Sequence, residues 1–178
     1  MHIEHYDRLT DERLLDGVWD LVCRYDRAFV PPLSARENTY QFNLSNHEAK
    51  SSAPKQYFEE LKGQAFFVAL ENDRVVGFMS YRPNYVIEDL NNEKTMYVTT
   101  IIVAEEQRGK GITTTFYKTL FSMLKKGESV TTRTWSTNDS HIRILHKLGF
   151  REIRRMEDSR GEGIDTVYYQ KIIEGDSN

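Results

Sequence analysis

Residues 105–115, EEQRGKGITTT, place Gly109 and Gly111 between an apolar run and a helical pattern. The preceding run, residues 96–103 (MYVTTIIV), is rich in β-branched side chains and predicts a central strand. Residues 112–125 repeat apolar side chains at helical spacing. Glycine permits positive φ, and the first turn of a helix carries unpaired N–H groups and partial positive charge. The stretch therefore predicts an anion site suited to phosphate or pyrophosphate, with a plain tight turn as the alternative.

Two nucleotide-binding patterns do not match this turn. A Walker loop requires Ser or Thr directly after its lysine, and Lys110 is followed by Gly111. The dinucleotide fingerprint GxGxxG would need glycine where Thr114 stands. The glycine turn is therefore expected to serve another phosphate-bearing ligand.

The rest of the sequence predicts one α/β domain with a mixed sheet. A helix capped by Thr10 runs to the Pro31-Pro32 pair, and the mixed segment 33–53 is expected to be a loop with one short helix. Further elements are predicted as a short helix at 54–63, a hairpin of 65–71 and 74–83, a strand at 129–136, a helix ending at Gly149, and two final strands.

Composition excludes several classes of function. The net charge of the 178 residues is −3, which predicts no nucleic-acid partner. No apolar segment is long enough to span a bilayer, and no signal peptide is evident, so a cytoplasmic protein without a membrane partner is expected. Cys23, the single cysteine, allows no internal disulfide and is expected to be buried in a helix. The histidines lack ligand spacing, so no metal site is predicted.

Two segments carry a resemblance to a known family. The stretch TTIIVAEEQRGKGITTTFYKTL resembles the acyl-CoA signature Q/R-x-x-G-x-G/A of the GNAT superfamily of acyl-CoA-dependent N-acetyltransferases, with Arg108, Gly111 and Thr113 at its three defined places. Thr113 departs from the usual Gly or Ala. The segment NDSHIRILHKLGF is similar to a second family segment and matches it at Asn138, Gly149 and Phe150.

The resemblance implies a fold and a domain. It implies an α/β (in some schemes α+β) fold: a twisted, mostly antiparallel mixed sheet with a central splayed parallel strand pair, flanked by about four helices. Residues 1–178 would form a single N-acetyltransferase-like domain, with a core of about 10–173 and a short flexible C-terminal tail.

The resemblance also implies a cofactor site for acetyl-CoA, used as a co-substrate without a metal. The splayed strand would pair its backbone with the pantetheine arm, and the glycine turn would bind the pyrophosphate. The residues implied for cofactor binding are Ile101, Ile102, Val103, Arg108, Gly109, Lys110, Gly111, Ile112, Thr113, Thr114 and Asn138.

The catalytic residues of the family match this sequence less completely than its cofactor-binding residues do. Many members of the family place a tyrosine, acting as general acid, where Leu145 stands, and some place a glutamate where Arg133 stands. His141, three residues after Asn138 on the same helical face, is the best substitute, with simple packing as its alternative role. Further candidates for deprotonating the amine are Glu71, Glu88 and Asp89.

The expected reaction is transfer of an acetyl group to a primary amine of a small molecule or peptide by direct attack in a ternary complex. The alternatives are a non-catalytic acyl-CoA-binding module and a phosphate-binding protein unrelated to CoA. Aromatic residues with Asp26, Glu37, Glu88 and Asp89 would suit a cationic acceptor. A homodimer is also compatible with the resemblance.

Overall fold

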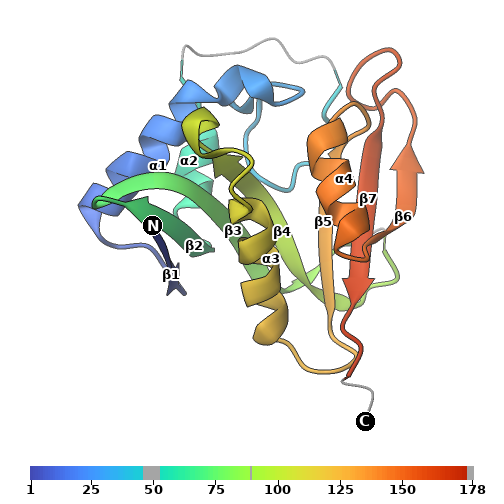
Figure 1. The fold of residues 1–178 in the computed structure, drawn as a ribbon. Coiled ribbons are helices and arrows are strands. Elements are labelled where there is room, and N and C mark those ends of the chain that lie inside the picture. The colour runs from blue at the N-terminus through green and yellow to red at the C-terminus, as the bar shows by residue number, and fades with distance from the viewer. Residues whose placement is uncertain (46–52, 89, 176–178) are drawn as a thin grey trace.

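The computed structural model describes residues 1–45, 53–88 and 90–175 as one twisted sheet with helices on both faces (Figure 1). The seven strands follow the order β1-β2-β3-β4-β5-β7-β6, and the β4–β5 pair alone is parallel among them. The strands are β1 His2–Tyr6, β2 Ala65–Glu71, β3 Arg74–Val86, β4 Lys94–Val103, β5 Ser129–Trp135, β6 Arg151–Met156 and β7 Thr166–Ile172.

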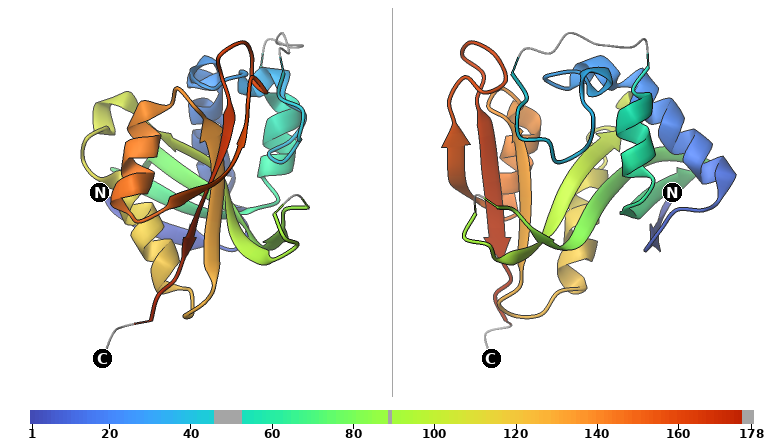
Figure 2. Two further views of the ribbon diagram at one scale, coloured as in Figure 1. Left: turned by 90° about the vertical axis from the view of Figure 1, so that its right-hand side faces the viewer. Right: turned by 180° about the vertical axis from the view of Figure 1, so that it is seen from behind.

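The helices form two layers around the sheet (Figures 1 and 2). Helices α1 (Glu12–Arg24) and α2 (Lys55–Leu61) cover one face, and α3 (Ile112–Ser122) and α4 (Asp139–Lys147) cover the other. Each face has its own apolar core: Val18 and Leu61 pack with Phe78 on the first, and Phe116 and Leu145 belong to the second. Short 3-10 turns lie at Asp26–Ala28, Leu33–Ala35 and Glu105–Gln107. The predicted fold class is thereby confirmed.

One strand was missed and three predicted boundaries were wrong. Helix α1 ends at Arg24 rather than at the Pro31-Pro32 pair. Strand β1 was not anticipated, because its alternating polar residues leave it partly exposed at the sheet edge beside β2. Strand β3 continues past residue 83 to Val86, and its polar end pairs with the start of β4 across a register shift that accommodates Pro83. Helix α3 ends at Ser122 rather than at residue 125.

Two local predictions about α1 were also wrong. Its N-cap is Asp11 rather than Thr10, and the Asp11 carboxylate accepts a hydrogen bond of 2.9 Å from the Arg13 N–H. Cys23 is exposed rather than buried, because the buried stripe of α1 runs through Val18 and Val22. None of the described helices combines the length and apolarity needed to cross a membrane. Part of the expected C-terminal tail, residues 176–178, lies outside the described residues.

Candidate active site

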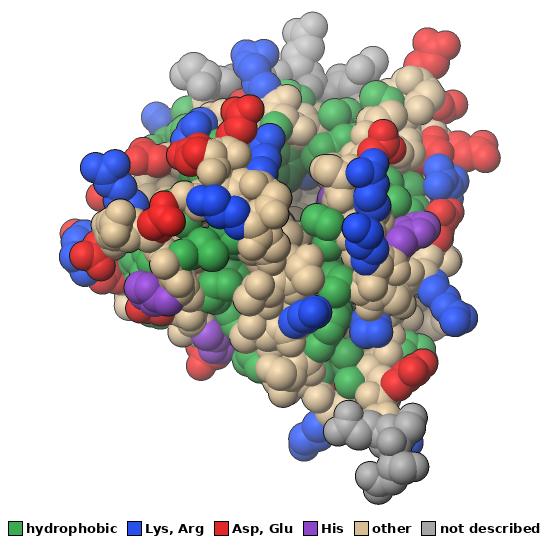
Figure 3. Space-filling model, in the orientation of Figure 1, with side chains coloured by type: hydrophobic (Ala, Val, Ile, Leu, Met, Phe, Trp, Pro, Cys, Tyr) green, Lys and Arg blue, Asp and Glu red, His purple; other side chains and the backbone are tan. Residues whose placement is uncertain are grey.

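A cleft opens where β4 and β5 separate. The two strands pair in parallel through Met96, Tyr97 and Val98 of β4, and no pair joins them beyond Val98–Thr132. Strand β5 keeps its pairing with β7 through Trp135, so the two halves of the sheet diverge. The resulting cleft has a volume of about 740 Å3. Figure 3 shows the surface hollowed between the starts of α3 and α4.

A β-bulge at Thr99 coincides with the point of separation. Val98 pairs with Tyr81 of β3, and Thr100 pairs with Ser80, so Thr99 is the extra residue. Bulges bend a strand and increase its twist, which turns the second half of β4 away from β5. We call the point where β4 and β5 separate the vertex. On its β5 side, the Thr132 hydroxyl donates a 3.0 Å hydrogen bond to the Val98 carbonyl. The bulge and this bond fix where the cleft begins.

The free edge of β4 presents alternate peptide groups to the cleft. The Ala104 N–H donates to Val76 of β3, and the Ile102 carbonyl also faces β3, 3.1 Å from the position of a Cβ on Gly77. Because strand peptides alternate, the N–H and C=O groups of Ile101 and Val103 point the other way, toward β5. These two residues therefore offer an extended ligand a strand edge that pairs with no other strand.

The glycine turn directs further N–H groups into the cleft. Gly109 and Gly111 adopt φ of 77° and 78°, which glycine accepts without strain. Gly111 is the N-cap of α3, and the first α-helical bond runs from Thr115 to Gly111. The N–H groups of Ile112, Thr113 and Thr114 thus have no intrahelical acceptor. The turn therefore has the geometry of an anion site, and the site itself stays a prediction.

Basic side chains gather on both rims of the hollow (Figure 3). Arg108 lies over the Tyr25 ring at 5.2 Å, and its Nε donates to the Val103 carbonyl at 3.4 Å. Lys147 lines the opposite side, from the last turn of α4. Lys110 does not line the cleft, and its Nζ donates to the Gln107 side chain at 2.7 Å. The rims favour an anionic ligand despite the negative net charge of the chain.

Asn138 and His141 line the cleft from the first turns of α4. The Asn138 side chain does not cap the helix; its amide donates to the Thr134 hydroxyl of β5 at 2.9 Å. The His141 Nε2 lies 3.0 Å from the Tyr117 hydroxyl of α3, and the two rings stack. Burial lowers the pKa of His141 to about 4 and raises that of Tyr117 well above its ordinary value. The pair is therefore uncharged at neutral pH.

Comparison with known proteins shows the family of the chain. Residues 33–150, about two thirds of the chain, match the Acetyltransferase (GNAT) family. The chain belongs to this family. Over 118 residues, 61% of the chain and 71% of the relative, it is 28% identical to an N-alpha-acetyltransferase of Saccharolobus solfataricus.

Solved structures share the fold at lower identity. An aminoglycoside 6'-N-acetyltransferase from Enterococcus faecium has a TM-score of 0.67 and 16% identity, and each chain is covered completely. The protein yncA from Salmonella typhimurium, solved with acetyl-CoA as its cofactor, has a TM-score of 0.63 and 16% identity over 100% of this chain and 98% of that one. The protein is thus an acetyl-CoA-dependent N-acetyltransferase that acts on an amine acceptor.

The geometry of the acetyltransferase fits acetyl-CoA. The β4 edge and the glycine turn supply unpaired backbone groups, and the described residues contain no cluster of His, Cys, Asp or Glu able to hold a metal. All the residues implied for cofactor binding line the cleft except Lys110. The N–H and C=O groups of Ile102 face β3, so only its other atoms can line the cleft.

Of the candidate carboxylates, the two that the structure describes do not line the cleft. The Glu71 carboxylate accepts a hydrogen bond from Gln107, and Glu88 is exposed on the loop before β4. Asp89 lies outside the described residues. Leu145, at the position where many relatives place tyrosine, is fully buried in the core. Among the singled-out candidates for proton transfer, His141 alone lines the described cleft.

Several lining residues were not anticipated. Arg133 and Trp135 line the cleft on the side of α1 and α2, together with Phe29, one of the aromatic residues expected near the acceptor. The two-residue period of a strand could have predicted that Arg133 and Trp135 lie on the same face of β5. Ser140, Ile144 and Lys147 recur at helical spacing on α4, a pattern that also follows from the sequence.

We expect Gly111→Asp to lose acetyl-CoA binding because the carboxylate would repel the diphosphate. Gly127→Asp is the matched control: Gly127 also has positive φ (89°) and open space around its Cβ position, and it does not line the cleft. Both variants should lose about 1–2 kcal/mol of stability from backbone strain. In thermal denaturation, acetyl-CoA should raise the Tm of Gly127→Asp but not that of Gly111→Asp. An equal rise in both variants would refute the site.

The low pKa of His141 predicts a dependence of stability on pH. The imidazole takes up a proton near its ordinary pKa of 6.5 in the unfolded chain, whereas in the folded protein it does so only near 4. The free energy of unfolding should therefore fall as pH drops from 6.5 to 4, by up to about 3 kcal/mol from this residue. His141→Gln should flatten this part of the profile in urea titrations, and exposed His146→Gln should not. Parallel profiles for the parent and His141→Gln would contradict the assignment.

Proposed function

We propose that the acetyltransferase acts on a primary amine of a small molecule or peptide, by direct attack within a ternary complex. One observation carries the proposal: the cleft passes through the sheet. Its lining combines the glycine turn, on the side of α3 and α4, with Phe29 and Arg133 on the side of α1 and α2. The two substrates can therefore enter from opposite faces and meet where β4 and β5 separate.

The cofactor would lie along the free edge of β4. Ile101 and Val103 would pair with the pantetheine arm, and the N–H groups of residues 109–114 would bind the diphosphate. A backbone N–H at the vertex can stabilise the oxyanion that develops on the thioester carbonyl. Holding both substrates at this vertex supplies proximity, which accounts for much of the rate of such transfers.

We assign His141 to proton transfer. As the new C–N bond forms and the C–S bond breaks, the N–H of the attacking nitrogen becomes more acidic, so even a weak base can remove its proton. An imidazolium with a pKa near 4 then protonates the thiolate readily, because a free thiol has a pKa of about 8.5. Tyr117, which remains protonated, orients the ring through Nε2.

The similarity to an N-alpha-acetyltransferase favours a primary α-amine as the acceptor. Peptides and free amino compounds both present such a group. The acceptor would reach the separation point of β4 and β5 beside Arg133, which lines the cleft and donates to the Thr39 and Gln41 carbonyls.

Release of free CoA thiol tests the proposed function. With acetyl-CoA and a panel of peptide and small-molecule amines, we expect sustained thiol release with at least one acceptor, and mass spectrometry should find that acceptor about 42 Da heavier, the mass of an acetyl group. A rise in Tm with acetyl-CoA but no thiol release from any amine would instead indicate a binding module.

We expect His141→Ala to lower kcat by about 100-fold while KM for acetyl-CoA changes little, because general acid–base groups contribute rate rather than affinity. His146→Ala serves as the control, since His146 is exposed on α4 and does not line the cleft. Tyr117→Phe should show a smaller loss of the same kind. Equal kcat in His141→Ala and the parent would return His141 to a packing role.

A further inference from the structure

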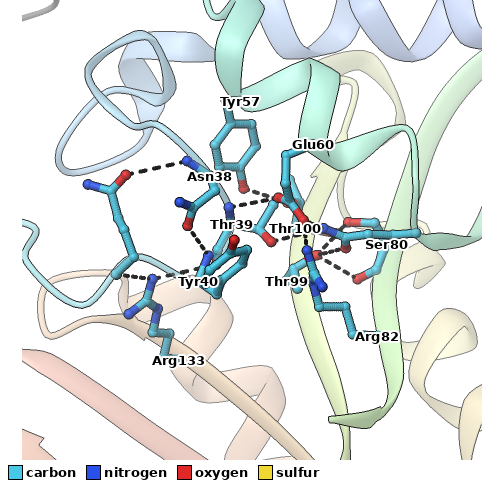
Figure 4. A network of polar contacts seen from close by, with 12 residues as sticks. Asn38, Thr39, Tyr40, Tyr57, Glu60, Ser80, Arg82, Thr99, Thr100 and Arg133 are labelled. Carbon is cyan, nitrogen blue, oxygen red and sulfur yellow. Dashed lines mark hydrogen bonds and ion pairs between the residues drawn. The ribbon is translucent and has the colours of Figure 1, made fainter. Parts of the chain in front are cut away.

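Three arginines converge beneath the acceptor end of the cleft. Arg133 projects from β5 toward the loop of residues 38–41 (Figure 4), where its Nη2 donates to the Gln41 carbonyl at 2.7 Å. Arg36 and Arg160 are both buried and donate to the same carbonyl, that of Val30, at 3.2 and 2.8 Å. We refer to Arg36, Arg133 and Arg160 as the arginine cluster.

Aromatic rings connect the cluster to the cleft. Phe29 and Trp135 line the cleft with their ring centroids 5.6 Å apart. The Arg36 guanidinium lies 5.6 Å from the Phe29 ring, and that of Arg160 lies 5.9 Å from the Trp135 ring. Arg36 and Arg160 thus lie against the Phe29 and Trp135 rings, and Arg133 itself lines the cleft.

No carboxylate balances these charges within ion-pair distance in the described part of the chain. The hydrogen-bond acceptors around the cluster are neutral: the carbonyls of Val30, Pro31, Thr39 and Gln41, and the Thr166 hydroxyl. Asp26, an acidic residue whose charge acts on Arg36, is held by the N–H and hydroxyl of Ser34 at 2.6 and 2.7 Å. Asp26 does not line the cleft, whereas Arg133 does.

Such a cluster is costly without an anion. Burial lowers the pKa of Arg36 and Arg160, and the positive charge of Arg133 lowers them further. Unpaired buried charges lose hydration and repel one another. An anion at the deep end of the cleft would offset both terms, since a guanidinium binds carboxylate or phosphate oxygens through two N–H groups.

We propose that the acceptor of this acetyltransferase carries an anionic group, a carboxylate or a phosphoryl group, close to its reactive amine, and that Arg133 binds this group with the charge of Arg36 and Arg160 behind it. This inference rests on the proposed function. It names the acceptor class as a zwitterionic amine such as an α-amino acid or an aminoalkyl phosphate.

The cluster also explains how the amine can react without a carboxylate base. Nearby positive charge disfavours the ammonium form, so it lowers the pKa of a bound amine. A larger fraction of the amine is then neutral and nucleophilic when it meets the thioester. Arg133 occupies the position where some members of the family carry a glutamate base. Its positive charge would promote loss of the amine proton by lowering the pKa of the amine, whereas a glutamate would accept that proton.

Matched acceptors test the inference. Thiol release at saturating acetyl-CoA would be measured for the common L-amino acids against their carboxamides, and for O-phosphoethanolamine against ethanolamine. We expect kcat/KM to be at least about tenfold higher for the anionic member of the productive pair, because only that member can form a charge-assisted hydrogen bond with Arg133. The carboxylate and phosphate arms identify the source of the anion.

Variants assign the preference to the cluster. Arg133→Gln should raise KM for the anionic acceptor and remove most of the preference, and Arg133→Lys should keep part of it. Arg151→Gln, an exposed arginine on β6, should change nothing. An unchanged rise in Tm with acetyl-CoA would show that Arg133→Gln is folded. As an independent readout, calorimetry with CoA present should show that the acetylated anionic product binds the parent more tightly than Arg133→Gln.

Two kinds of failure remain distinct. If amines are acetylated but the neutral member of each pair is used equally well or better, the anion site is refuted and the acetyltransferase assignment stands. If no amine releases thiol and the anionic products do not bind, both proposals are refuted. If the preference survives in Arg133→Gln, the anion is bound elsewhere and the role of the cluster is refuted.

Discussion

The separation of β4 from β5 after Val98 is the constraint on which the remainder of the site depends. Three parallel pairs hold the strands together up to Val98–Thr132, and the bulge at Thr99 then turns β4 away. A strand edge inside a domain is normally paired, because unpaired buried peptide groups are costly. Here the edge at Ile101 and Val103 stays open, and the glycine turn that follows places helix N–H groups beside it. The fold thereby keeps a ready site for an extended ligand that ends in phosphate.

A polar network on the α2 side of the sheet supports the strands where β4 separates from β5 (Figure 4). The hydroxyl of Thr100 bonds that of Tyr57 at 2.6 Å, and Thr99 bonds both Ser80 and Gln64. Glu60 accepts the Thr39 N–H at 2.9 Å and pairs with Arg82, which ties α2, β3 and the loop together. Because this network is largely satisfied within the protein, it can support the bulge while Arg133, nearer the cleft, retains capacity for a ligand. Support of the strand and contact with the acceptor are thus divided among different residues.

Local patterns account for what the sequence predicted. Strand β4, the start of α3 and the stop of α4 at Gly149 follow from apolar periodicity and from glycine, both of which act within a few residues. The edge strand β1 was missed because its side chains are half polar, and the paired extension of β3 because Pro83 and Asn84 resemble a turn. The arginine cluster could not be predicted, since residues 36, 133 and 160 meet only through tertiary packing. The place of Asp26 also depends on tertiary packing: it is near in sequence to cleft residues, but its carboxylate accepts hydrogen bonds from Ser34.

A crystal structure of the acetyltransferase with CoA tests the central claim most directly. The account predicts that the amide groups of the pantetheine arm pair with the backbone of Ile101 and Val103, and that the diphosphate accepts N–H groups from residues 109–114. Electron density for CoA along another surface, with the β4 edge unpaired or closed against β5, would contradict it.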